Sequence, residues 1–96
     1  MLIKAGVSIE RLERHTRRGL GITNWVFERC DEELIITSTF EGNHGAGSLH
    51  YANQAFDIRH TQNKTCCVAE ILERELGEDF DVVEELDHIH IEYDPK

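Results

Sequence analysis

Two histidines separated by a single residue occur near the end of the chain, in the segment 88–93 (HIHIEY). Because successive side chains of a β-strand point to opposite faces, a strand here places His88, His90 and Glu92 on one face and apolar residues on the other. Imidazole nitrogens are common metal ligands, so two of them on one polar face suit a metal cleft. Solvated or hydrogen-bonded histidines fit the same pattern, and the metal hypothesis therefore requires ligands from a second segment.

A second segment that contains potential ligands is 48–58 (SLHYANQAFDI). Residues 54–59 alternate as in a β-strand, which places Asp57 on the face opposite two apolar neighbours. His50 precedes Asp57 by seven residues, so we expect the histidine in the loop before this strand. Two imidazole nitrogens and one carboxylate oxygen that converge there can bind Zn²⁺ at about 2.0–2.2 Å and leave a fourth position for water, as in a catalytic zinc site.

Two regions have the apolar periodicity of helices. The first covers residues 8–30, and Gly19 and Gly21 are expected to divide it into two helical pieces. The second covers residues 64–76, and Gly77 stands where a C-terminal cap belongs. We therefore expect helical structure both before the strands and between them.

Alternating patterns and β-branched residues mark the expected strands, at 34–38, 54–59, 79–84 and 88–93. Residues 41–48 (EGNHGAGS) contain three glycines and are expected to form an irregular loop. The order of helices and strands predicts a single α+β domain over residues 1–96, with a small, mostly antiparallel sheet and helices packed on one face.

The residues of the two polar segments match a known motif in type and order. Its pattern is Ser-x-His-x-x-Gly-x-Ala-x-Asp, followed far downstream by a strand histidine, often in His-x-His. The matching residues here are Ser48, His50, Ala55, Asp57, His88 and His90. From about residue 34 to its end, the chain thus resembles the M15 family of zinc D-Ala-D-Ala peptidases, above all short phage-encoded members. The resemblance implies the fold that these enzymes share with the hedgehog signalling domain.

The sequence departs from the family pattern at two places. Asn53 stands at the position of the motif glycine, and asparagine is among the non-glycine residues that best tolerate a positive φ. Many members carry an arginine after the Thr-Ser strand that holds the substrate carboxylate, whereas this chain has TFE at 39–41. We therefore favour endopeptidase over carboxypeptidase activity, with Arg59 as a candidate replacement for the missing cation.

The resemblance implies that the zinc ion is held by His50, Asp57 and His90. Zinc at this site would lower the pKa of its bound water toward about 7 and polarise the scissile carbonyl. A neighbouring carboxylate must then take the proton of the water and pass it to the leaving amine. Zn²⁺ is accordingly the expected cofactor, and hydrolysis of a peptide bond the expected reaction.

Other side chains near the ligands are candidates for catalysis and substrate binding. The candidates for the base are, in order of preference, Asp87, Glu85 and Glu84. His88 lies on the same strand face as His90, and we expect it to hydrogen-bond the tetrahedral intermediate or to orient the water. Substrate binding is assigned to Ser48 and Arg59.

Composition and charge exclude several classes of protein. The net charge is −9 and the basic residues are dispersed, so a nucleic acid would be repelled. No run approaches the roughly 18 apolar residues of a membrane span, which argues against membrane insertion. The charged N-terminal segment differs from a secretory signal, so we expect synthesis in the cytoplasm. The resemblance to phage-encoded members implies action on the cell wall, either after release or as part of a virion. The cysteines lack Cys-x-x-Cys spacing and are interpreted as small buried side chains of a reduced protein.

The resemblance implies that the substrate is the peptide part of bacterial peptidoglycan, either a stem peptide or a cross-link. One alternative is a zinc-stabilised binding module of the same fold without peptidase activity. A second alternative is a metal-free acidic interaction domain, such as a component of a phage virion. The carboxylates that precede the last strand favour the enzyme, and the sequence indicates neither the bond that is cleaved nor the oligomeric state.

Overall fold

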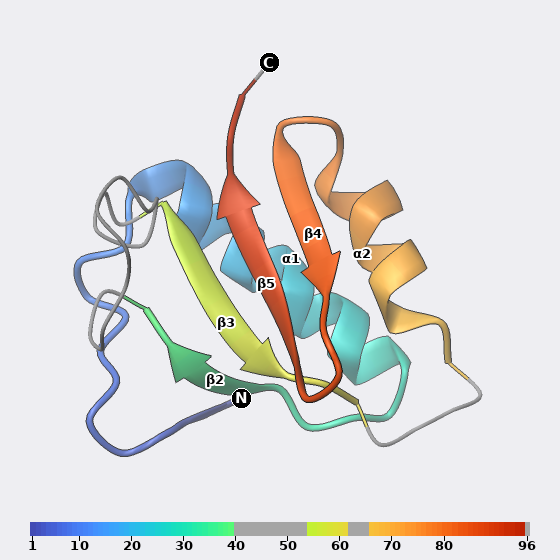
Figure 1. The fold of residues 1–96 in the computed structure, drawn as a ribbon, viewed down its shortest axis with the longest axis horizontal. Helices are drawn as coiled ribbons and strands as arrows, with labels where there is room; N and C mark the ends of the chain where they lie inside the picture. The colour runs from blue at the N-terminus through green and yellow to red at the C-terminus, as the bar shows by residue number, and fades with distance from the viewer. Residues whose placement is uncertain (40–53, 62–65, 96) are drawn as a thin grey trace.

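In the part of the chain that the structure describes, five strands form a single sheet and two helices pack on one of its faces (Figure 1). The computed structural model describes residues 1–39, 54–61 and 66–95. Its elements are β1 (Leu2–Ile3), α1 (Arg14–Arg29), β2 (Ile35–Ser38), β3 (Ala55–Arg59), α2 (Val68–Leu76), β4 (Phe80–Glu84) and β5 (His88–Tyr93). Neither α1 nor α2 has the length and apolar character that a membrane crossing requires, and this holds for every helix in the described part of the chain.

The strands lie in the order β1-β2-β3-β5-β4. β1 runs parallel to β2, and the three other pairs are antiparallel. The α+β class and the mostly antiparallel sheet are thus confirmed, and the predicted strands agree with β2 to β5 within one residue at each end. β1 was not expected, because its two residues are too few to show an alternating pattern. The expected loop at 41–48 lies outside the described residues.

The hydrophobic core lies between the sheet and the helices. Alternate strand residues are fully buried on this side, namely Ile36, Phe56, Ile58, Ile89 and Ile91. The helices contribute Leu20, Val26, Phe27, Val68, Leu72 and Leu76. Full burial of a side chain of this size stabilises the fold by about 1.5–3 kcal/mol. Because these residues fix one face of the sheet against the helices, the intervening strand residues must lie on the opposite face, which we call the open face.

Helix α1 differs from the expectation of two helical pieces that begin near Ser8. It begins at Arg14, because the carboxylate of Glu13 accepts hydrogen bonds from the backbone N–H groups of the first helical turn. It then continues without a break through Gly19 and Gly21. Gly19 permits a close approach instead of a break, since a Cβ at this position would lie 2.6 Å from the ring of Phe80.

Helix α2 begins at Val68, four residues later than expected, and ends as expected at Gly77, whose φ is +84°.

The interpretation of all three cysteines as reduced is wrong. A disulfide joins Cys30, at the end of α1, to Cys66, just before α2, and Cys67 is free and exposed. The two bonded residues are 36 positions apart, and only the packing of α1 against α2 brings their Cα atoms to 6.0 Å.

The close contact at Gly19 can be tested against a matched glycine in the same helix. We expect Gly19→Ala to lower the free energy of unfolding by about 1–3 kcal/mol, because the new methyl group overlaps the ring of Phe80. Gly21→Ala is the control, since a Cβ at this position meets no atom of the other described residues within 4 Å, apart from the neighbouring backbone of its own helix. It should raise the stability by about 1 kcal/mol through helix propensity. Urea denaturation measures both values, and equal effects of the two substitutions would contradict the contact.

Candidate metal centre

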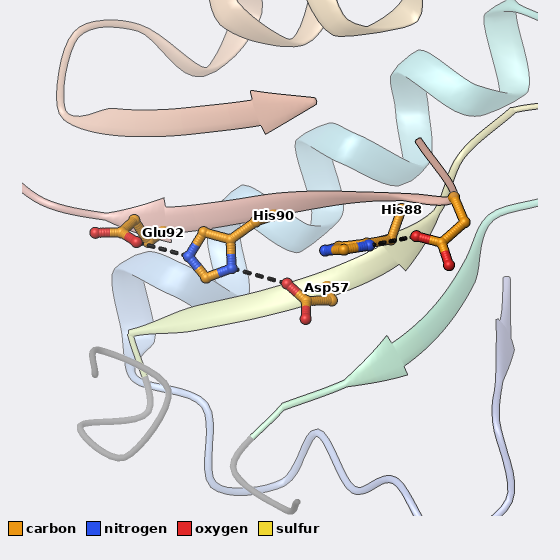
Figure 2. Close-up of polar contacts among 5 residues, drawn as sticks. Asp57, His88, His90 and Glu92 are labelled. Atoms are coloured by element: carbon orange, nitrogen blue, oxygen red, sulfur yellow. Dashed lines mark hydrogen bonds and ion pairs between the residues drawn. The ribbon is translucent and has the colours of Figure 1, made fainter. Parts of the chain in front are cut away.

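Strands β3 and β5 bring the two polar segments of the sequence together. They pair in antiparallel register, with Asp57 opposite His90 and Arg59 opposite His88. Directly opposed residues of an antiparallel pair share a face of the sheet. The apolar residues between them are buried against the helices, so the polar side chains lie together on the open face. Figure 2 shows Asp57 of β3 beside the side chains of β5 on this face.

The polar contact that links the two strands at the candidate site joins Asp57 of β3 to His90 of β5. His90 Nδ1 lies 2.8 Å from Asp57 Oδ1, a hydrogen bond in which the imidazole donates to the carboxylate. The exposed fraction is 22% for the side chain of His90 and 18% for that of Asp57, so the pair is partly shielded from water but still accessible. The contact therefore places one nitrogen and one oxygen ligand side by side at the surface of the open face.

The other ring nitrogen of His90 contacts a second carboxylate. His90 Nε2 lies 2.6 Å from Glu92 Oε1 (Figure 2). The hydrogen bond with Asp57 raises the pKa of His90, burial opposes this effect, and the hydrogen bond with Glu92 raises the pKa further. A carboxylate at each nitrogen therefore favours the doubly protonated imidazole over the neutral ring.

The donor set at Asp57 and His90 fits a zinc ion. Two ligands at about 2.0–2.1 Å from a tetrahedral ion lie roughly 3.3 Å apart. Asp57 Oδ1 and His90 Nδ1, now 2.8 Å apart, would therefore separate by only about half an ångström. A metal-bound imidazole commonly donates its other N–H to a carboxylate, which is the position of Glu92. The third expected ligand, His50, lies outside the described residues.

A hollow of about 420 Å³ on the open face borders Asp57. It is lined by Lys4, Thr37, Asp57, Arg59, Asp87 and His88. His88 Nδ1 donates to Asp87 Oδ1 at 2.7 Å, and this hydrogen bond lowers the pKa of Asp87. The structure thus gathers three of the expected catalytic and substrate-binding residues, namely Arg59, Asp87 and His88, around the hollow beside the Asp57 carboxylate. Ser48, the other expected substrate-binding residue, lies outside the described residues.

The two other candidates for the base lie elsewhere. Glu84 Oε2 accepts a hydrogen bond of 2.5 Å from His60 Nε2. Both Glu84 and Glu85 line a separate hollow, together with the first residues of α2. The turn between β4 and β5 therefore distributes the three acidic residues, and of these only Asp87 lines the hollow that Asp57 also lines.

Sequence reasoning placed Glu92 on the face of His90 but gave it no role. The signal was present, since the period of two in HIHIEY already aligned Glu92 with His90. Glu92 also belongs to the group of three possible metal ligands found among the described residues, with Asp81 and Asp94, whose ligand atoms lie within 4.8 Å of one another. That group offers only carboxylate oxygens, which suit Mg²⁺ or Ca²⁺ better than zinc.

No protein-family model, curated protein or solved structure matches the chain. The resemblance to zinc D-Ala-D-Ala peptidases therefore rests on the motif residues. Of these, the structure describes Ala55, Asp57, His88 and His90, all within the paired strands β3 and β5.

The two carboxylates predict the titration of His90 in metal-free protein. We expect its pKa, followed by NMR, to lie above the ordinary value of 6.5, because Asp57 and Glu92 favour the protonated ring. Protonated His90 then stabilises the metal-free fold below the unfolded pKa, and this contribution is lost as the pH rises through the folded pKa. Asp57→Asn should lower the pKa of His90.

Asp31→Asn is a suitable control, because Asp31 lies outside the site and asparagine tolerates its φ of 56°. This substitution should leave the titration of His90 unchanged. An unchanged pKa of His90 in the Asp57→Asn protein would show that the hydrogen bond is absent in solution.

Proposed function

We propose that the chain is a zinc-dependent peptidase that hydrolyses the peptide part of bacterial peptidoglycan, with its metal held by His50, Asp57 and His90. The observation that carries the proposal is the contact of 2.8 Å between Asp57 Oδ1 and His90 Nδ1, with Glu92 on the other ring nitrogen. These ligands come from separate segments of the chain, in the order that the peptidase motif has. The small α+β fold with an open sheet face agrees with a hedgehog/DD-peptidase arrangement, which is part of the proposal.

Each side chain of the site has a part in the proposed reaction. Zinc, when bound, supplies a Lewis acid that polarises the scissile carbonyl and lowers the pKa of a water molecule. Glu92 orients the imidazole of His90 by accepting its second N–H. Asp87 is kept as a carboxylate by His88, and this is the form that takes a proton from the water and then passes it to the leaving amine.

His88 and Arg59 are placed to contact the substrate. The hydrogen bond to Asp87 occupies Nδ1 of His88 and leaves Nε2 to bind a substrate oxygen. Lys4 and Arg59 line the hollow beside Asp57 in a chain whose net charge is −9. A guanidinium binds a carboxylate through two parallel hydrogen bonds, so Arg59 suits one of the carboxylates that peptidoglycan peptides carry. Both endopeptidase and carboxypeptidase activity agree with this arrangement.

A zinc-stabilised binding module of the same fold is the second candidate. The observation in its favour is that Asp87 is largely exposed, with 89% of its side chain accessible, and bonds to His88 and not to the Asp57–His90 pair. A base for catalysis is usually held within hydrogen-bond reach of its proton donor. Zinc binding without peptide hydrolysis would identify the module, whether it acts alone or within a phage virion.

Zinc analysis tests the metal site directly. We expect the purified protein to contain one equivalent of zinc and to lose its activity on peptidoglycan when a chelator removes the metal. Added zinc should restore cleavage, which mass spectrometry of the released peptides detects. His50→Ala, Asp57→Asn and His90→Gln should each lose zinc, since each removes one of only three protein ligands.

His60→Gln is the matched control, because His60 bonds to Glu84 at another hollow. It should keep the metal. Full activity in metal-free protein would rule out the mechanism, and retention of zinc by the Asp57→Asn protein would rule out the proposed ligand set.

A substitution at Asp87 tests its role as the catalytic base independently of metal binding. We expect Asp87→Asn to bind zinc as tightly as the wild type and to reduce kcat by about 10²–10⁴-fold, the usual contribution of a positioned base. Glu85→Gln is the control at a neighbouring position that lines the other hollow, and it should keep its activity. If Asp87→Asn were fully active and Glu85→Gln inactive, the base would be Glu85.

A further inference from the structure

Among the described residues, strand β4 is an edge of the sheet, and no other strand pairs with the side of its backbone that faces away from β5. At the two ends of the β4–β5 hairpin, Asp94 N–H donates to the carbonyl of Asp79 and Glu85 N–H donates to the carbonyl of His88. Backbone hydrogen bonds occur at every second residue of an antiparallel ladder. The residues of β4 that bond to β5 are therefore Asp81 and Val83, which lie two and four positions after Asp79. The N–H and C=O groups of Val82 and Glu84 therefore point away from β5, toward the free edge.

This edge borders a groove of about 660 Å³ between β4 and α2, which lie side by side (Figure 1). The groove is lined by Glu73, Gly77, Glu78, Phe80, Asp81, Val82, Val83 and Glu92. Its charged residues are all acidic, with Glu73 and Glu78 on the side of α2 and Asp81 and Glu92 on the open face. The side chain of Val83 adds an exposed apolar surface.

We propose that the free edge of β4 binds an extended segment of a partner protein that carries basic side chains, and that this segment pairs with β4 as an additional strand. Unpaired N–H and C=O groups of an edge strand are a template for such pairing. In an added strand, successive side chains alternate between the α2 side and the open face, and each of these sides presents two carboxylates. Basic residues on both faces of the segment therefore meet opposite charge.

A second copy of this chain does not fit the edge. Two β4 strands paired edge to edge would bring their own acidic residues together, in a protein whose net charge is already −9. A basic partner is attracted by the same charges, which raises the rate of encounter at low salt. The surface thus selects for the sign of the partner's charge as well as for its extended conformation. The proposal does not depend on zinc binding or on peptidase activity.

The test uses a labelled, capped peptide that repeats Lys-Lys-Val-Val over about eight residues, the length of an ordinary strand, so that lysines lie on both of its faces. We expect it to bind the full chain in fluorescence anisotropy and to shift the amide NMR signals of Val82 and Glu84 more than those of β1. A matched peptide with glutamate in place of lysine should not bind. Binding should weaken as salt rises from 0.1 M to 1 M, where the Debye length falls from about 10 Å to about 3 Å.

Two pairs of variants separate backbone pairing from charge. Glu84→Pro removes the outward N–H, which an edge strand tolerates, while Glu84→Ala removes the same carboxylate and keeps the N–H. The proline variant should bind at least about tenfold more weakly than the alanine variant. Glu73→Gln combined with Glu78→Gln should weaken binding about threefold to tenfold, and Glu28→Gln combined with Glu32→Gln should not.

The amide spectrum of each variant verifies that it is folded. If the lysine peptide fails to bind, the acidic edge serves only to block strand pairing and the proposal is wrong. Equal binding to the Glu84→Pro and Glu84→Ala proteins would also overturn it, because the backbone of β4 would then take no part.

Discussion

The pairing of Asp57 with His90 across β3 and β5 is the contact on which the candidate site depends. The hydrophobic core determines this register, since the apolar neighbours of both residues are buried against the helices. A slip of one residue in either strand would turn its polar side chains toward the core and its apolar ones toward water. The packing that stabilises the fold therefore also specifies which carboxylate meets which imidazole, although none of the core side chains belongs to the site.

The electrostatics of His90 connect this register to the proposed chemistry. The imidazole of His90 lies between the carboxylates of Asp57 and Glu92, which favours a proton on each nitrogen, and the proposed zinc ion would compete for the nitrogen that faces Asp57. Glu92 then keeps its hydrogen bond and fixes the orientation of the ring. The remaining polar groups are distributed by the β4–β5 hairpin, which directs Asp87 to the hollow beside Asp57 and Glu84 to the opposite side. One short turn thus decides which acidic residue lies beside Asp57 for the proposed reaction.

Much of this arrangement follows from local patterns in the sequence. The period of two predicted the faces of β3 and β5, and with them the grouping of His88, His90 and Glu92. The features that local patterns did not predict depend on residues far apart in the chain. Gly19 lies within a continuous helix, where its lack of a side chain makes room for the ring of Phe80, and Cys30 meets Cys66 because α1 packs against α2. The adjacency of β3 and β5 is of the same kind, since β4 and α2 separate these strands in the sequence.

The most direct test of the central claim is a crystal structure of the zinc-loaded protein, with the ion located by anomalous scattering. The proposed site predicts one strong peak within about 2.0–2.2 Å of an oxygen of Asp57, Nδ1 of His90 and a nitrogen of His50. The hydrogen bond between Glu92 and the other nitrogen of His90 should remain. A zinc ion bound instead by Asp81, Glu92 and Asp94, with Asp57 still bonded directly to His90, would contradict the account.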